Sequence, residues 1–147
     1  MSKSRKNPLK NKASKKSDIK GKSNPFGFNA PVVFSFKELD STQHLKETFE
    51  CWDKENLLPK LLNKIKDVST MNMSDATQSN TIKNYGHFPE SNKTKYKVPT
   101  HLSKELQWAS MHIQGREVVA GHIVENVFYI VFLDREHKFW ISKKKYT

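Results

Sequence analysis

Five residues in the last third of the chain carry side chains that can transfer protons or hold a phosphate. They are His112, Arg116, Glu117, Asp134 and His137. An imidazole titrates near neutral pH, so two histidines can take and return a proton, and a guanidinium can hold a phosphate by two hydrogen bonds. These residue types predict an acid–base and phosphate-binding cluster, provided that the fold brings them to one place.

The elements that must position these residues are three strand-like runs of β-branched and aromatic residues. The runs cover residues 108–113, 116–124 and 127–133. Two turns, Gln114-Gly115 and Glu125-Asn126, separate the runs at the spacing of two-residue hairpin loops. The pattern predicts an antiparallel meander, which a fourth short strand at residues 137–141 extends.

The register of this meander follows from its turns by counting. If both turns close as two-residue loops, His112 faces Glu117, and Glu117 faces Asp134 on the third strand. The same counting places His122 opposite Tyr129, where packing or a structural hydrogen bond is expected. The predicted chemistry depends on this register, because a slip by one residue turns each side chain to the opposite face.

Less specific interpretations of the same residues stay open. His112 and Glu117 can form an ordinary charge pair on an exposed sheet end, and Arg116 can lie at a solvated strand start. The cluster could instead hold a divalent metal, but its spacing matches no standard zinc motif. We therefore expect no metal and no cofactor.

Upstream of the meander, the pattern predicts one strand and two helices. Residues 32–36 are β-branched or aromatic and are expected to form the strand. A helix over about residues 42–53 would bury an apolar stripe that begins at Leu45, and a second helix would cover about residues 59–68. The two helices lie close enough in sequence to form an antiparallel hairpin.

Residues 69–100 are predicted to form a long loop with a short helix near residues 71–77. The fold class is therefore α+β, in which an N-terminal strand and a two-helix hairpin precede an antiparallel meander of three to four strands. Both faces of this meander are apolar enough to be at least partly covered.

The positive charge of the chain is concentrated at its N-terminal end. The 147 residues include 26 Lys and Arg against 15 Asp and Glu, and residues 1–24 alone hold nine basic residues and one acid. Because this segment has few apolar residues, we predict a disordered basic tail at 1–24, a hinge at 25–31 and a single α+β domain at 32–147. The tail residues expected to contact nucleic acid are Lys3, Arg5, Lys6, Lys10, Lys12, Lys15 and Lys16. A solubilising extension without a specific partner is the alternative.

Composition excludes several other classes of protein. A single cysteine, Cys51, cannot form an intramolecular disulfide. No run approaches the roughly 18 apolar residues of a membrane span, and no apolar segment follows the basic start as a secretory signal requires. We expect a soluble cytoplasmic protein that does not bind a membrane.

Three segments of the last third resemble the RelE/ParE superfamily of bacterial toxins. Residues 114–121 resemble the family's turn followed by an arginine on the next strand, and residues 127–134 resemble its hydrophobic penultimate strand. Residues 137–140, His-Lys-Phe-Trp, resemble the closing histidine-plus-aromatic segment. The predicted order of strand, two helices and meander is also similar to the RelE-like fold.

This resemblance implies a metal-independent endoribonuclease in which a 2′-hydroxyl attacks the adjacent phosphate. Arg116 would then stabilise the phosphate, His137 would act as acid or base, and Trp140 would stack on a base. The expected catalytic residues are His112, Arg116, Glu117 and His137, and the expected substrate-binding residues are Asp134, Lys138 and Trp140.

We therefore predict a toxin that cleaves RNA, either free or on the ribosome, and that a small acidic antitoxin protein neutralises. The alternative is a non-catalytic nucleic-acid-binding or phage-type accessory protein whose basic tail supplies affinity. A third hypothesis is a structural interaction protein that uses residues 140–146.

Overall fold

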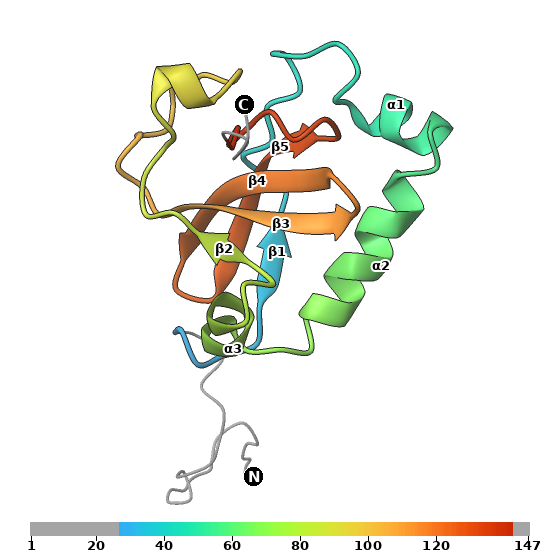
Figure 1. Cartoon of the computed structure of the whole chain (residues 1–147). Coiled ribbons are helices and arrows are strands. Elements are labelled where there is room, and N and C mark those ends of the chain that lie inside the picture. The colour runs from blue at the N-terminus through green and yellow to red at the C-terminus, as the bar shows by residue number, and fades with distance from the viewer. Residues whose placement is uncertain (1–26, 143–147) are drawn as a thin grey trace, which may run out of the picture.

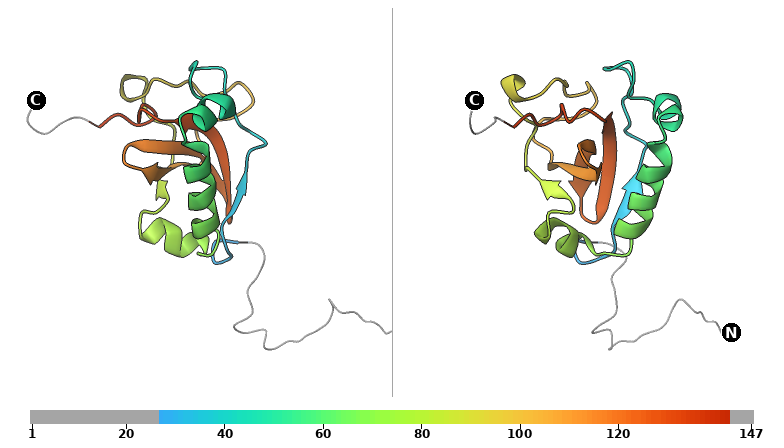
Figure 2. Two further views of the ribbon diagram at one scale, coloured as in Figure 1. Left: turned by 90° about the vertical axis from the view of Figure 1, so that its right-hand side faces the viewer. Right: turned by 45° about the vertical axis from the view of Figure 1, so that its right-hand side comes forward.

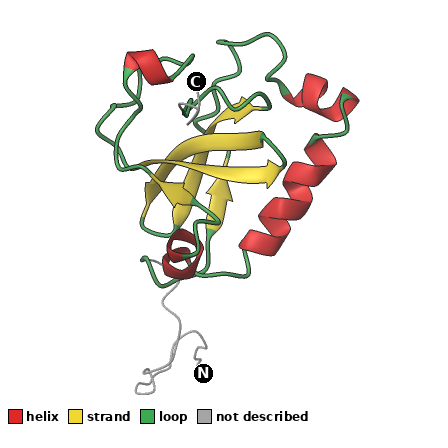
Figure 3. Cartoon of the chain, viewed as in Figure 1, coloured by secondary structure: helices red, strands yellow, loops and turns green. Residues whose placement is uncertain are grey.

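A mixed sheet of five strands forms the centre of the structure (Figures 1 and 3). The computed structural model describes residues 27–142, so the tail predicted at residues 1–24 lies outside the described part of the chain. The strands are β1 (Val33–Ser35), β2 (Lys83–Asn84), β3 (Trp108–Gln114), β4 (Glu117–Val124) and β5 (Val127–Asp134). Their order is β1-β5-β4-β3-β2, with β1 parallel to β5 and the other neighbours antiparallel. The α+β class, the N-terminal strand and the meander are thus confirmed.

The second hairpin of the meander has the predicted register. Val124 pairs with Val127, and His122 faces Tyr129. Glu125 has a φ of 56°, the left-handed conformation that a two-residue turn requires. The rings of His122 and Tyr129 stack with their centroids 4.9 Å apart, so the predicted packing of this pair is confirmed.

The first hairpin is shifted by one residue from the predicted register. His112 faces Val118, so the predicted pairing of His112 with Glu117 is wrong. The cause is a bulge at Ile113, which moves the turn one residue further along the chain. Gly115 takes part in this turn with a φ of 59°.

A second bulge lies between β4 and β5, at Val131. Beyond this bulge Asp134 faces Val118, so the predicted pairing of Asp134 with Glu117 is wrong as well. An extra residue in one strand cannot be found by counting from the turns, which is why the predicted row of three side chains does not form.

Three α-helices occur in the described part of the chain. They are α1 (Phe49–Lys54), α2 (Leu58–Val68) and α3 (Met73–Gln78). The helices α2 and α3 confirm the second helix and the short helix of the prediction. The helix α1 begins later than the predicted residue 42, because Thr48 is its N-cap and accepts the N–H of Cys51 at 3.1 Å. The expected burial of Leu45 is therefore wrong, since this side chain is 94% exposed.

The helix α1 lies at the N-terminal end of α2 (Figure 1). With six residues against eleven, α1 does not extend along α2 as the predicted antiparallel hairpin requires. The chain between β1 and α1 forms turns instead of helix, and these turns cross one end of the sheet.

Both faces of the sheet are buried, as the composition of its strands predicts. The core on the helical face includes Leu61, Val68, Met73, Met111, Ile123 and Phe128. The core on the opposite face includes Phe88, Tyr96, Trp108, Phe132 and Phe139. Figure 2 shows the helix α2 and the long loop that precedes β3 on opposite sides of the sheet. The predicted strand at residues 137–141 is wrong, because this segment forms bends and inserts Phe139 into the second core.

At Gly121, the backbone of β4 lies too close to that of β5 to admit a side chain. A Cβ at this position would collide with the carbonyl oxygen of Tyr129 and would lie 2.8 Å from its carbonyl carbon. The absence of a side chain at Gly121 is therefore a condition for the pairing of the two central strands.

We expect Gly121→Ala to lower the free energy of unfolding by about 3 kcal/mol, because backbone on both strands must move to admit the methyl group. Urea denaturation of the full chain measures this change. The control is Val124→Ala, which removes a half-exposed side chain from the same strand and should cost less than about 1 kcal/mol. Equal midpoints for Gly121→Ala and the wild type would contradict the close approach.

His122 is buried on the second face without a hydrogen bond to either of its ring nitrogens among the described residues. It is 5% exposed, and besides stacking on Tyr129 it packs against Trp108 at a ring-centroid distance of 5.8 Å. Burial lowers the pKa of His122 below its usual value, because the imidazolium form would lose its hydration. Folding therefore favours the neutral form of the His122 imidazole.

Replacing His122 with Phe should raise the free energy of unfolding at pH 7.5 by about 1 kcal/mol, because two buried nitrogens without partners are removed. The wild type should also lose stability as the pH falls below about 6.5, since the unfolded imidazole then binds a proton that the folded one does not. Thermal denaturation between pH 5 and 8 measures both effects. An acid slope that is as steep in the variant as in the wild type would contradict this assignment.

Candidate functional site

The turn after β5 is built on the carboxylate of Asp134. This residue is 1% exposed, and its carboxylate oxygens accept the N–H of Lys138 at 2.9 Å and the N–H of Phe139 at 2.7 Å. The hydroxyl of Tyr96 lies 3.3 Å from the same carboxylate. Because groups of the protein contact both oxygens, the geometry favours a positioning role for Asp134, and its expected contact with substrate stays a prediction.

His137 stands on this turn in the left-handed region, with a φ of 61°. A residue other than glycine keeps this conformation where the surrounding structure holds it in place. The ring of His137 lies beside that of His112, with the centroids 5.2 Å apart and the planes inclined by 42°. The turn thus brings His112 and His137, two of the predicted catalytic residues, together. This contact does not depend on the predicted pairing of His112 with Glu117, which does not form.

The surroundings of His112 are positively charged. The pKa of His112 is lowered first by burial, and then by the positive charges of His137, Lys64 and Lys83. Lys64 belongs to α2, which packs against β3, and Lys83 belongs to β2, which pairs with β3, so charges from two elements act on this imidazole. An anion bound at His112 would be attracted by all of these groups.

Aromatic side chains adjoin the two imidazoles. The rings of Tyr85 and Trp140 stack at 4.0 Å with an interplanar angle of 4°, and the ammonium of Lys83 lies 5.4 Å from the Tyr85 ring. The hydroxyl of Tyr85 is 3.1 Å from Oγ of Ser110, which precedes His112 by two residues on β3 and therefore points to the same face. The aromatic pair and the imidazoles thus form one surface. We call Lys83, Tyr85, His112, His137 and Trp140 the two-histidine site.

Arg116 and Glu117 lie elsewhere. Glu117 directly precedes Val118, the residue that faces His112, and neighbouring side chains of a strand point to opposite faces. Glu117 therefore points to the helical face, while His112 points away from it. Both residues line a cavity of about 350 Å³ that also contains Arg135. Their expected catalytic roles stay predictions, but the structure does not unite them with His112 on one face.

The cavity that holds Arg116 contains charges of both signs. Its charged lining residues are Glu55, Lys60, Arg116, Glu117, Arg135 and Glu136. The guanidinium of Arg135 lies 3.4 Å from the carboxylate of Glu55, and Nζ of Lys138 lies 3.9 Å from that of Glu136. This balance of charge favours an anion less than the positive charges of His137, Lys64 and Lys83 near His112 do.

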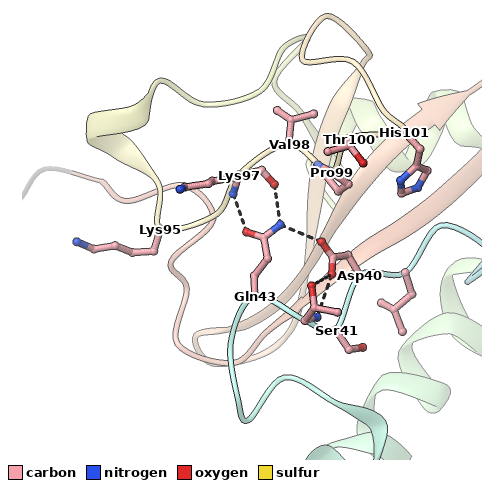
Figure 4. Close-up of a pocket in the computed structure, with 11 residues that line it drawn as sticks. Asp40, Ser41, Gln43, Lys95, Lys97, Val98, Pro99, Thr100 and His101 are labelled. Atoms are coloured by element: carbon pink, nitrogen blue, oxygen red, sulfur yellow. Dashed lines mark hydrogen bonds between the residues drawn. The ribbon is translucent and has the colours of Figure 1, made fainter.

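A larger cavity, of about 730 Å³, lies between two loops at a different place (Figure 4). The side-chain amide of Gln43 accepts the N–H of Lys97 at 2.7 Å and donates to the Lys97 carbonyl at 2.8 Å and to Asp40 at 2.9 Å. The one imidazole in its lining, His101, lies 2.9 Å from a carboxylate oxygen of Glu38. These contacts join the loops, so we assign this cavity a structural origin and place the candidate site at the two histidines.

Two residues of the two-histidine site, Lys83 and Tyr85, were not predicted from sequence, and neither was the nearby charge of Lys64. They were missed because nothing in the sequence pattern connects them with β3. The pairing of Lys83 with Ser110 in the sheet places the middle of the predicted loop beside β3, two residues from His112. The spacing of residues within the meander could not have revealed this.

Comparison with protein-family models, curated proteins and solved structures finds no match to this chain. The resemblance to the RelE/ParE superfamily therefore stays a prediction. Within residues 27–142, no group of three or more His, Cys, Asp or Glu side chains is arranged to hold a metal ion. No helix of that same part is long and apolar enough to cross a membrane.

Proposed function

We propose that this protein cleaves RNA without a metal, as an endoribonuclease of the RelE/ParE toxin type, with His112 and His137 as its acid–base pair. The observation that supports the proposal best is the 5.2 Å separation of the two imidazole centroids within positively charged surroundings. A bound phosphate diester would neutralise the repulsion among these groups. The aromatic rings of Tyr85 and Trp140 lie where unstacked bases could pack beside it.

In the proposed reaction His112 is the base, because its lowered pKa keeps the imidazole neutral near pH 7. It takes the proton of a 2′-hydroxyl, whose oxygen forms a bond to the adjacent phosphorus. The bond from phosphorus to the 5′-oxygen then breaks, and His137 as imidazolium gives its proton to that oxygen. The products are a 2′,3′-cyclic phosphate and a 5′-hydroxyl. Lys83 stabilises the negative charge that develops on the phosphate oxygens.

The partners belong to the same proposal. Single-stranded RNA, including mRNA on the ribosome, is the substrate class, and a small acidic protein is the expected antitoxin. The basic tail would add affinity that falls as the salt concentration rises. The cytoplasm is the expected location, because RNA of this kind is found there.

Purified full-length protein should cleave a single-stranded RNA in the presence of EDTA and leave 2′,3′-cyclic phosphate ends. We expect His112→Ala and His137→Asn each to lower the cleavage rate about 100-fold or more, the usual contribution of a general acid or base. Asn is chosen at residue 137 because it tolerates a positive φ, so the turn is retained. End-labelled RNA resolved on denaturing gels measures the rate.

The matched control is His101→Asn, which changes an imidazole outside the two-histidine site and should leave the rate within about twofold of the wild type. An RNA with a 2′-deoxy group at the cleaved position should be inert. Full activity of the double variant of His112 and His137 would overturn the proposal. RNA binding without any cleavage by the wild type would instead support the non-catalytic nucleic-acid-binding alternative.

The pH dependence of cleavage gives a separate prediction. Since the base must be neutral, kcat/KM should rise with pH through the pKa of His112, which lies below the usual imidazole value of about 6.5. Lys83→Gln removes a positive charge that lowers this pKa, so the rising limb should move to higher pH. The control Lys66→Gln, an exposed position on α2, should leave the limb in place. A limb that moves to lower pH in Lys83→Gln would contradict the assignment of His112.

A further inference from the structure

A cavity beside Trp140 adjoins the two-histidine site and has no part in the proposed proton transfers. It has a volume of about 560 Å³ and is lined by Asn92, Lys93, Trp140, Ile141 and Ser142. One wall is the short 3₁₀ helix η2 (Ser91–Lys93) of the long loop, and the other is the segment that follows the Asp134 turn. The cavity thus lies between two segments that are distant in sequence.

Backbone hydrogen bonds hold these two walls together. The N–H of Ile141 donates to the carbonyl of Lys93 at 2.8 Å, and the N–H of Lys95 donates to the carbonyl of Lys138 at 2.9 Å. The hydroxyl of Thr94 lies 3.4 Å from the same Lys138 carbonyl. The cavity is therefore fixed to the turn that positions His137.

The indole of Trp140 can serve as a stacking surface in this cavity. Tyr85 stacks on the indole at 4.0 Å and the His87 ring lies 5.7 Å from it, and the indole still lines the cavity. The stack on Tyr85 holds the indole plane in place without closing the cavity. Any nucleobase can stack on such a ring, because every base has a π-face.

The polar side chains of the cavity are free to bind. Among residues 27–142, the side chains of Asn92 and Lys93 form no hydrogen bond or ion pair, and both residues are exposed. A carboxamide presents one donor and one acceptor side by side, which matches the N6 and N7 positions of adenine. An ammonium group one residue further along the chain can neutralise the phosphate of the same nucleotide.

We propose that this cavity is a nucleotide-binding subsite, in which Trp140 stacks on the base, Asn92 selects adenine and Lys93 contacts the phosphate. The inference rests on the proposed function, because it assigns to the RNA a nucleotide bound next to the cleaved bond. It adds a base preference that the two imidazoles cannot supply, since they act on the sugar and the phosphate.

Titration of the full-length protein with AMP, GMP, CMP, UMP and ribose 5-phosphate tests the subsite, with the indole N–H of Trp140 followed by NMR. We expect AMP to shift this resonance at the lowest concentration and to bind at least fivefold more tightly than ribose 5-phosphate. Asn92→Ala should weaken AMP binding about tenfold and remove the preference over the other bases. The control Asn63→Ala, an exposed amide on α2, should leave AMP binding unchanged.

Two results would overturn the subsite. One is binding of ribose 5-phosphate as tight as that of AMP, and the other is unchanged AMP binding in Asn92→Ala. The double variant of His112 and His137 separates this inference from the proposed function, because it should bind AMP while cleaving no RNA. AMP binding at Trp140 in a wild type that cleaves nothing would retain the subsite and reject the nuclease. RNA cleavage without AMP binding at Trp140 would retain the nuclease and reject the subsite.

Discussion

The buried carboxylate of Asp134 is the constraint on which the arrangement of the candidate site depends. A carboxylate that loses its hydration is costly unless donors replace the water. Here the N–H groups of Lys138 and Phe139 supply those donors, and in doing so they turn the chain back over the sheet. The turn fixes His137 at a positive φ and inserts Phe139 into the core, so the energetic need of one buried charge places an imidazole beside β3.

A second buried carboxylate supports the same turn. Glu47 accepts the indole N–H of Trp52 at 2.6 Å and the backbone N–H of Arg135 at 3.0 Å, and burial raises its pKa. The charge of Asp134 adds to this rise, and burial together with that charge also raises the pKa of Tyr96. The loop before α1 and the long loop before β3 thus meet at the end of β5. The irregular segments of the chain are ordered by this polar centre as well as by apolar packing.

The sequence pattern correctly predicted the elements whose formation depends on residues that are close together in the chain. Alternation and the Glu125-Asn126 turn correctly predicted the second hairpin, and apolar periodicity predicted α2. The predicted strand register was wrong beyond Ile113 and Val131. A bulge depends on how two strands pair, so the residue spacing within one strand does not indicate it.

The long loop was the least predictable part for a related reason. Gln43 binds the backbone of Lys97 from a distant segment. Tyr96 packs in the core on the face of the sheet opposite the helices, although the residues around it follow neither a helical nor a strand period. Contacts of this kind are set by tertiary structure, so periodicity within the loop could not indicate them.

The candidate site was predictable in its residue types and only partly in its geometry. His112 and His137 meet, but Glu117 points to the other face because the bulge at Ile113 changes which residues lie opposite each other. The acid that counting placed beside the imidazole is replaced there by Lys64 and Lys83. This difference changes the chemistry: a carboxylate beside His112 would have stabilised the imidazolium, whereas burial, followed by the charges of His137 and the two lysines, favours the neutral ring.

The neutral ring and its positive neighbours together favour an anionic substrate over a neutral one. The positive charges of His137, Lys64 and Lys83 oppose protonation of His112, and the carboxylate oxygens of Asp134 accept backbone N–H groups instead. A phosphate diester brought to His112 would supply the missing negative charge while leaving the ring free to accept a proton. The same electrostatic arrangement, built from residues of α2, β2, β3 and the Asp134 turn, would therefore serve the proposed reaction twice, by attracting an anion and by favouring a neutral base.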